Sequence, residues 1–289
     1  MPERLNLVQC AFKSLQPLEV RGSLQSGLVV EPVELKPQGT PDDTLAATRM
    51  MCKSGCNLLI TFGGDGTNRL VAMESGQVPL LPISAGTNNI FPLSCEGTRA
   101  GLVAGIFLKM LNSGTDLPSG ISVNELVQQQ KLLLAETDSW SETALIDLAI
   151  SRQASLGGRA IWDADWLQGV FVTRCAPGAS GLCGIPGGVM DIHPLAPHGA
   201  AAFLGNRFSV QAVLTAGKVQ TVGLESVERM NLHQLHTMEV SEGTVLADGE
   251  RVRELHNEKV RITLHPEGPW VLDFEATLAA GLQQGYFQI

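Results

Sequence analysis

Apolar and polar positions alternate at helical and strand spacing over the first part of the chain. Residues 41–53 place apolar side chains on one helical face behind two aspartates, which favour a helix N-terminus. Short apolar runs of strand length follow, and each leads into a further helical segment. The predicted elements are a helix at 41–53, a strand at 57–62, a helix at 68–74, a strand at 78–83 and a helix at 97–111. This alternation indicates a parallel sheet, so we expect an α/β Rossmann-like domain over residues 1–115.

Short strand-like runs dominate beyond a hinge at 112–120 that contains Gly, Ser and Pro. Clusters of glycine and proline separate these runs, most densely at 176–181 and 184–188. The runs lie at 131–136, 143–151, 169–174, 207–214, 218–224, 258–264 and 269–274. They predict a mostly β domain over residues 116–289. Because small-molecule sites commonly lie between domains, we expect the active site in the cleft that separates the two.

The net negative charge of the 289-residue chain argues against nucleic acids and anionic membranes as partners. Its formal net charge is −9 and its sequence pI is about 5.2. No basic stripe is present to neutralise nucleic-acid phosphates, and an anionic membrane would repel such a surface. No apolar run reaches the ~18 residues that span a bilayer, and the N-terminus lacks a signal-peptide pattern. We therefore expect a cytoplasmic protein with no nucleic-acid and no membrane partner.

The spacing of cysteine and histidine does not match a metal-binding motif. The six cysteines show no C-x-x-C pattern, and the six histidines form no H-E-x-x-H pattern. Cys52 and Cys56 lie four residues apart in a predicted helical stretch, where buried thiols are expected. His193 and His198 flank prolines in an apolar stretch, and we interpret them as packed or capping side chains. No structural metal site is predicted.

The most informative segment joins the first predicted strand to the helix after it. Gly63, Gly64 and Gly66 surround a single carboxylate, that of Asp65, directly after the apolar run at 58–62. Glycines at such a turn permit positive φ and let a phosphate approach the main-chain amides closely. A carboxylate there would repel a phosphate, so we expect Asp65 to meet a hydroxyl group or a metal ion. The alternative is a tight loop in which Asp65 caps the next helix.

A second turn follows about 20 residues later, after the strand predicted at 78–83. It contains Gly86, Thr87, Asn88 and Asn89. Two such strand-to-turn elements lie together at the carboxyl edge of one parallel sheet, which is where open α/β sheets bind ligands. The pair therefore favours a nucleotide or phosphate site over two unrelated loops.

These motifs resemble those of a known superfamily. The Gly-Gly-Asp-Gly-Thr turn at 63–67 resembles the signature of the NAD kinase and diacylglycerol kinase superfamily, and the turn at 86–89 resembles its second nucleotide-site turn. Residues 80–92 are most similar to the acetoin catabolism protein X branch, whose members are often described as ATP-NAD kinases. Three further segments resemble the superfamily. Residues 144–152 resemble the NAD kinase strand that carries an Asn-Glu pair, and residues 192–198 resemble the proline-rich stretch near the nicotinamide pocket of those enzymes. Residues 246–250 resemble a late Asp-Gly turn found in both branches.

The resemblance implies an NAD kinase-like fold and an ATP-dependent kinase acting on NAD or a related small molecule. Asp65 would hydrogen-bond the acceptor hydroxyl, take up its proton late in the transfer, or hold Mg²⁺. The nucleotide and its phosphates would be bound by Gly63, Gly64, Gly66, Thr67, Gly86, Thr87, Asn88 and Asn89. The substrate would contact Asp147, Ser180, Asp248 and Glu250. By the same resemblance the chain would form a homodimer or homotetramer, and a last helix at 275–283 would return to the first domain.

Three departures from the superfamily pattern keep other functions open. The chain passes from residues 1–8 into a helix-like stretch, so the usual first strand is expected to be absent. Ile146 stands where NAD kinases carry Asn, which predicts weaker NAD binding and a gain on Ile146→Asn. The loop at 176–181 lacks the aromatic residue of those enzymes but keeps small residues and backbone donors. A diacylglycerol-type lipid kinase and a non-catalytic nucleotide-binding regulator are therefore the alternatives.

Overall fold

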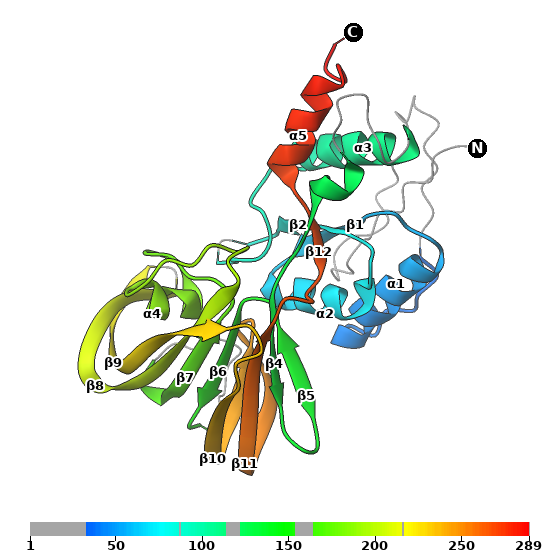
Figure 1. Cartoon of the computed structure of the whole chain (residues 1–289). Coiled ribbons are helices and arrows are strands. Elements are labelled where there is room, and N and C mark those ends of the chain that lie inside the picture. Colours follow the sequence, from blue (N-terminus) through cyan, green and yellow to red (C-terminus); the bar gives the residue numbers. More distant parts are fainter. Residues whose placement is uncertain (1–32, 87, 114–121, 154–163, 216, 289) are drawn as a thin grey trace.

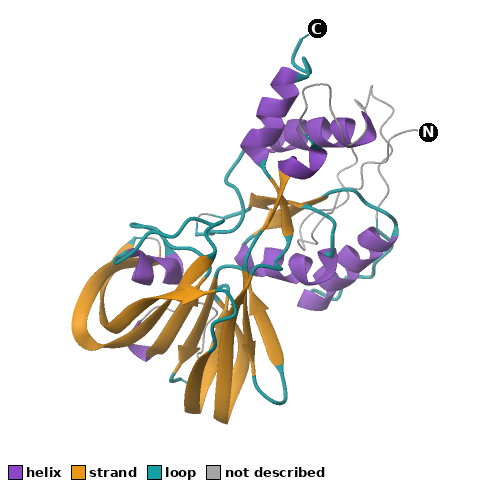
Figure 2. Cartoon of the chain, in the orientation of Figure 1, coloured by secondary structure: helices purple, strands orange, loops and turns teal. Residues whose placement is uncertain are grey.

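The described part of the chain is built on two sheets. The computed structural model describes residues 33–86, 88–113, 122–153, 164–215 and 217–288. A four-stranded sheet has the order β1-β2-β12-β3, and an eight-stranded sheet has the order β5-β4-β11-β10-β6-β7-β8-β9. Figure 1 shows the small sheet among helices in the upper part of the view and the large sheet below it, and Figure 2 shows the same division by secondary structure. The expected α/β layer followed by a mostly β layer is confirmed.

The two strands of the small sheet that lead into the glycine turns are parallel to each other. Its strands are β1 (Leu59–Gly63), β2 (Leu80–Ser84), β12 (Trp270–Leu272) and β3 (Val127–Gln129). β1 pairs with β2 in parallel, with Gly63 opposite Ser84 at their carboxyl ends. β12 is also parallel to β2, and β3 runs antiparallel to β12. Both glycine turns therefore leave the same edge of one sheet.

Helices cover both faces of this sheet. They are α1 (Pro41–Lys53), α2 (Asp65–Ser75), α3 (Gly97–Ser113) and α5 (Phe274–Gln283). Leu80 packs with residues of α1 and α2, whereas its neighbour Leu81 packs with residues of α3 and α5. Successive residues of a strand point to opposite faces, so β2 is buried on both sides and is apolar from Leu80 to Ile83. Figure 1 shows the two helix pairs on opposite sides of β1 and β2.

The helix predictions hold closely, with one informative shift. α1 spans the predicted 41–53, and the Asp43 carboxylate accepts the N–H groups of Gln38, Gly39 and Thr40 ahead of it. α2 begins at Asp65, three residues earlier than expected, with Gly64 as its N-cap. The Asp-Gly-Thr part of the first glycine turn is thus the first turn of a helix.

The large sheet is antiparallel throughout. Its strands are β4 (Leu132–Glu136), β5 (Ser141–Ala144), β6 (Asp147–Ser151), β7 (Leu167–Val172), β8 (His198–Thr215), β9 (Lys218–Asn231), β10 (His236–Ala247) and β11 (Glu250–His265). Each face has its own apolar core, with Leu148 and Phe171 in one cluster and Ala149 and Val170 in the other. The short elements η2 (Ala164–Trp166), η3 (Gly181–Cys183) and α4 (Gly184–Gly187) lie among these strands.

Several strand predictions in this half were wrong in their bounds. The run at 143–151 is two strands, β5 and β6, which lie at distant positions in the sheet. β10 was not expected, and β8 and β9 are longer than the runs at 207–214 and 218–224. In each case pairing with a partner strand, rather than the alternation of apolar residues, determines where the strand begins and ends.

Segments from beyond residue 115 complete the first layer. The predicted strand at 269–274 is β12, which inserts between β2 and β3 of the small sheet. The short helix η1 (Val123–Leu126) and α5 also pack there, with Leu126 and Phe274 in one cluster with α3. The first layer is therefore not a continuous stretch of sequence. The expectation about a first strand concerns residues outside those described, as does most of the hinge at 112–120.

Candidate functional site

The first glycine turn is shaped by close packing rather than by unusual backbone angles. None of Gly63, Gly64 and Gly66 has a positive φ, so that part of the sequence argument was wrong. A Cβ on Gly64 would lie 2.8 Å from Asn89 Oδ1, and one on Gly66 would lie 2.5 Å from Glu250 Oε1. Glycine allows the ends of these two polar side chains to approach the backbone closely, and a Cβ at either position would have to displace them.

The second turn is organised around Ser84 at the end of β2. The Ser84 hydroxyl donates to the Gly86 carbonyl at 2.8 Å and accepts from the Asn89 side-chain amide at 2.9 Å. The N–H of Ala85 donates to the Gly63 carbonyl at 3.3 Å, which links this turn to the first one. Thr87 lies outside the described residues.

Asp65 joins the two turns. Its Oδ1 accepts the N–H groups of Phe91 at 2.8 Å and Ile90 at 3.1 Å, and its Oδ2 also lies 3.1 Å from the Ile90 nitrogen. Burial raises the pKa of Asp65, whereas these N–H groups and Arg174 oppose that rise. Asp65 is thus both the opening residue of α2 and the anchor of the loop that follows the second turn.

The late Asp-Gly turn is a two-residue hairpin connection. Ala247 pairs with Glu250, and the residues between them, Asp248 and Gly249, have φ of 51° and 74°. Positive φ at both positions is typical of a type I′ turn, for which Asp-Gly is a preferred sequence. The turn therefore places Asp248 and Glu250 at fixed positions at one end of β10 and β11.

Asp248 also explains why the strand predicted at 143–151 is divided. Its carboxylate accepts the N–H groups of Leu145 at 2.9 Å, Ile146 at 2.7 Å and Asp147 at 3.3 Å. Those three groups are taken from the strand ladder, so the chain leaves β5 and enters β6 at this point. Burial raises the pKa of Asp248 to about 7 even though the three donors favour its ionised form.

Asp147 is the most unusual carboxylate of the region. It is 7% exposed, and its Oδ1 is a buried atom with no hydrogen-bond partner. Burial, followed by the charges of Asp248 and Asp65, raises the pKa of Asp147 well above its ordinary value. A buried carboxyl group with one oxygen that has no partner is suited to donating a hydrogen bond to a ligand or to binding a cation.

Arg69 supplies the positive charge beside these carboxylates. Its guanidinium is buried, with Nη2 3.4 Å from Glu250 Oε2, Nε 3.9 Å from Asp248 Oδ2 and Nη1 3.8 Å from Glu142 Oε2. Because α2 carries Arg69 while β5 and β11 carry two of its partners, this side chain connects the two layers of the molecule. The sequence analysis missed Arg69; the signal available was a cation one turn after Asp65 in an amphipathic helix.

One cleft of about 390 Å³ brings most of the predicted residues together. The predicted residues that line it are Gly64, Asp65, Gly66, Thr67, Asn88, Asn89, Asp147, Ser180, Asp248 and Glu250. Gly63 and Gly86 lie behind it in the two turns and do not line it. Ser180 enters from the loop before η3 and bridges to Val213 of β8. The cleft is strongly acidic, with four carboxyl side chains among its lining residues.

Ile146 does not belong to this cleft, and the expectation built on it was wrong. Its side chain is fully buried in the apolar core beside Ala149 and Val170, and only its backbone N–H is used by Asp248. Ile146 precedes β6 in the segment bound by the Asp248 carboxylate, and its side chain packs in the apolar core while Asp147 lines the cleft. The gain in NAD binding expected from Ile146→Asn therefore has no support in the cleft, and weaker NAD binding by this chain stays a prediction.

Metal binding by the protein alone finds no support among the described side chains. No group of three or more His, Cys, Asp and Glu residues there is arranged to hold a metal ion. Cys56 is buried and Cys52 half-buried, and both are free thiols.

No described helix has the length and apolar character needed to cross a membrane.

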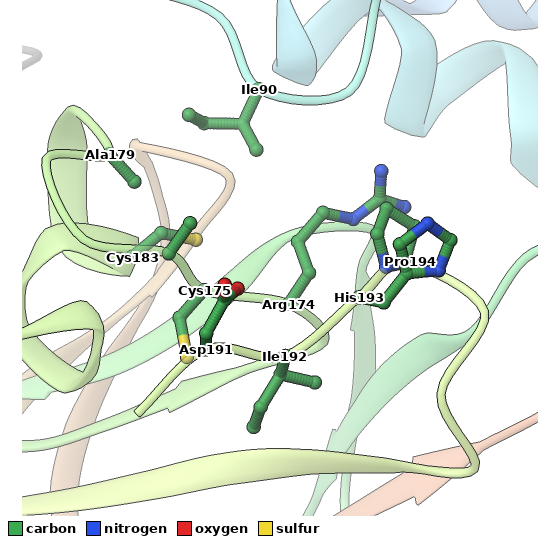
Figure 3. Close-up of a pocket in the computed structure, with 10 residues that line it drawn as sticks. Ile90, Arg174, Cys175, Ala179, Cys183, Asp191, Ile192, His193 and Pro194 are labelled. Carbon is green, nitrogen blue, oxygen red and sulfur yellow. The ribbon is translucent and has the colours of Figure 1, made fainter. Parts of the chain in front are cut away.

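A second cavity, of about 590 Å³, adjoins the first through Ile90, which lines both. Its walls are mostly apolar and come from the loops at 174–183 and 190–194. Arg174, which the sequence analysis also missed, extends into it (Figure 3). His193 is exposed at this cavity, and its Nδ1 accepts the N–H of Leu195.

Comparisons with known proteins agree with this arrangement. Residues 5–95 match the ATP-NAD kinase N-terminal domain family, and residues 130–267 match the acetoin catabolism protein X C-terminal domain family. The chain is 31% identical over 263 residues to the acetoin catabolism protein X of Cupriavidus necator, covering 88% of this chain and 71% of that protein. The resemblance expected from the motifs is therefore confirmed.

Proposed function

The chain belongs to the acetoin catabolism protein X family, and on that premise we propose that it is an ATP-dependent phosphotransferase of the NAD kinase type. The acceptor would be a hydroxyl group of NAD, of a related nucleotide or of a small alcohol. The observation that carries the proposal is the convergence of both glycine turns with Asp147 and Asp248 on one cleft. Phosphoryl transfer needs alignment and charge control more than covalent chemistry, and such a cleft offers both.

In the proposed reaction the acceptor oxygen forms a bond to the γ-phosphorus of ATP. The bond from that phosphorus to the oxygen shared with the β-phosphate breaks, and ADP leaves. Asp65 takes up the hydroxyl proton. Its Oδ2 shares a single backbone N–H with Oδ1, so it keeps acceptor capacity, and burial raises its pKa in the direction that suits a proton acceptor.

The first turn of α2 would bind the phosphates. The opening N–H groups of a helix have no partner within it, and the helix dipole favours an anion at that end. Gly64, Gly66 and Thr67 lie at this terminus and line the cleft, and Asn88 and Asn89 lie opposite. Arg69 offsets part of the negative charge of the nearby carboxylates.

Mg²⁺ is the metal that such a reaction implies, and the residues present are compatible with it. Mg²⁺ is usually bound through one or two carboxylates together with substrate phosphates, rather than by a complete protein cage. Asp147 would hold it, since it lines the cleft and its Oδ1 has no hydrogen-bond partner; Asp65 would bind the metal only in place of taking up the proton. Bound there, it would neutralise charge on the phosphates.

A non-catalytic nucleotide-binding role is the second candidate. The hydrogen bonds from the Ile90 and Phe91 N–H groups to the Asp65 carboxylate favour this role. They show that Asp65 holds the second loop in place, a structural task that does not need catalysis. A lipid kinase fits the acidic charge of the chain less well, since an anionic surface would repel it.

A thermal-shift panel tests the proposal against both alternatives. A ligand that binds only the folded state stabilises it by about 2.7 kcal/mol at a hundred times its Kd. We expect ATP and ADP with Mg²⁺ to raise the melting temperature, and NAD or NADP to do so independently. A shift with a short-chain diacylglycerol and none with NAD would favour the lipid kinase. Nucleotide binding without ADP formation, over a range of acceptor alcohols, would favour the regulator, and no shift with any nucleotide would refute the proposal.

The assembly and location belong to the same proposal. We infer a cytoplasmic homodimer or homotetramer whose partners are a nucleotide and a small acceptor, with no nucleic acid and no membrane. The acidic charge and the family membership support these inferences. Light scattering of the purified protein measures the assembly directly, and a monomer at micromolar concentration would contradict it.

A further inference from the structure

The second cavity contains a half-buried cation, that of Arg174, for which the described residues provide no ion pair. Arg174 follows the end of β7, and its Nη2 donates to Gln130 Oε1 at 2.9 Å. Its Nε is buried with no hydrogen-bond partner, and no carboxylate oxygen of the described residues lies within ion-pair distance of it. Its guanidinium carbon lies 5.7 Å from the centre of the Phe91 ring. Buried arginines are ordinarily paired, so this one retains unused donors.

The residues around Arg174 limit the kind of ligand that can bind to its free N–H groups. Figure 3 shows the guanidinium ending on the side of His193 and Pro194, with Ala179 and Cys183 on the opposite side of the cavity. Ala176, Ile192 and Pro194 add to the apolar wall. A ligand that fills this space would therefore meet one cation and a largely apolar surface.

Charges of both signs surround Arg174, and none of the described carboxylates forms an ion pair with it. Asp65 and Asp248 act on Arg174 electrostatically from the side of the cleft, and Lys131 adds a like charge. Asp191 also lines the cavity but is exposed to solvent, where its repulsion is screened. Arginine binds a planar carboxylate in bidentate fashion, and the pairing strengthens when both groups are shielded from water.

We infer that this cavity binds a small organic carboxylate with a short apolar body, its carboxylate on Arg174. Ile90 lines both cavities, so a hydroxyl on the same molecule comes next to the cleft that contains Asp65. The acceptor class this implies is a small hydroxy acid. The binding claim stands on the cavity alone, whereas phosphorylation of the ligand rests on the proposed function.

Other ligands suit this cavity less well. A nicotinamide ring in its oxidised form is cationic and would be repelled by the unpaired guanidinium. Inorganic phosphate needs several donors around it, and the wall opposite Arg174 is apolar. A carboxylate with a short alkyl chain matches both features of the cavity.

Calorimetric titration of the full chain with 2-hydroxybutyrate and with its neutral amide, 2-hydroxybutyramide, tests the inference. The two probes differ in charge and little in shape, so the comparison needs no variant. We expect the acid to bind at least about tenfold more tightly than the amide, and Arg174→Met to lose about tenfold or more for the acid alone. Asp191→Asn removes the carboxylate at the rim and should strengthen binding of the acid by about twofold.

Arg174→Lys is the conservative variant if Arg174→Met does not fold; it keeps the charge and should retain part of the affinity. Equal binding of acid and amide, or no saturable binding of the acid, would overturn the inference. Saturable binding of inorganic phosphate without binding of the acid would also overturn it. Binding of 2-hydroxybutyrate without its phosphorylation, in protein that ADP stabilises, would leave the cavity assignment intact and count against the proposed function alone.

Discussion

Asp65 Oδ1 accepts the backbone N–H of Phe91 at 2.8 Å, across 26 residues of sequence. This bond closes the two glycine turns into one unit at the carboxyl edge of the small sheet. It also gives Asp65 a structural task in addition to any chemical one, so a substitution there changes two properties that must be measured separately.

Asp65→Asn should lower turnover by ~10²-fold or more, the usual scale for a positioned proton acceptor. The amide also replaces an oxygen that accepts N–H bonds, so the free energy of unfolding should fall by about 1–3 kcal/mol. Steady-state ADP release and urea denaturation measure the two effects. Asp42→Asn is the matched control, because that exposed carboxylate on α1 lies outside both cavities. Unchanged turnover in folded protein would contradict the role of Asp65.

Stability should decrease as pH rises from about 4 toward and through 7. Burial raises the folded-state pKa of Asp248 to about 7 and that of Asp147 well above the ordinary value. The folded state therefore binds more protons than the unfolded state over this range, and the stability present below the unfolded pKa is lost as the folded carboxyl groups ionise. Urea denaturation at pH 5 and pH 8 measures this change.

Asp147→Asn should flatten that pH dependence, because the neutral amide cannot ionise in the buried site. At pH 8 the variant should be more stable than the wild type by roughly 1 kcal/mol or more. An identical pH dependence in the two proteins would show that Asp147 titrates normally.

Ile146→Asn should destabilise the protein by about 2–5 kcal/mol, since it puts an amide with no partner into the apolar core. Affinity for NAD should not increase. Ile146→Val is the control for lost volume and should cost only about 0.5–1.5 kcal/mol. Tighter NAD binding by a stable Asn variant in calorimetry would restore the original assignment of residue 146 to the ligand.

Gly64→Ala should weaken nucleotide binding by about tenfold, because its Cβ would lie 2.8 Å from Asn89 Oδ1 and displace that side chain. Gly105→Ala is the matched control. Gly105 lies exposed on α3, and a Cβ there meets no atom within 4 Å, so the change should stabilise the protein by up to about 1 kcal/mol. ADP titration of both variants provides the comparison, and equal affinities would show that the turn tolerates a side chain.

Local sequence patterns were sufficient for the part of the first layer formed by residues 41–113, because these helices and strands follow one another directly in the chain. Helical spacing predicted α1 with its observed bounds, and apolar runs that end in glycine placed β1 and β2. The two turns could be paired from their positions in the chain because parallel strands end at the same edge of a sheet. The Asp-Gly signal likewise identified the hairpin turn at 248–249, since few residues tolerate positive φ at both positions.

What the sequence by itself determined is thus the order of the elements over residues 41–113, the family and most residues of the cleft. Only the tertiary structure decided that Asp248 divides the strand around Ile146, which lies 102 residues earlier in the chain, and that β12 joins the first sheet. It also decided that Arg69 becomes a buried cation beside the cleft and that Arg174, with a buried Nε, extends into the second cavity. The reason is physical: periodicity records which face of an element is apolar, whereas the partner of a buried carboxylate, guanidinium or strand edge is set by contacts between segments far apart in the chain.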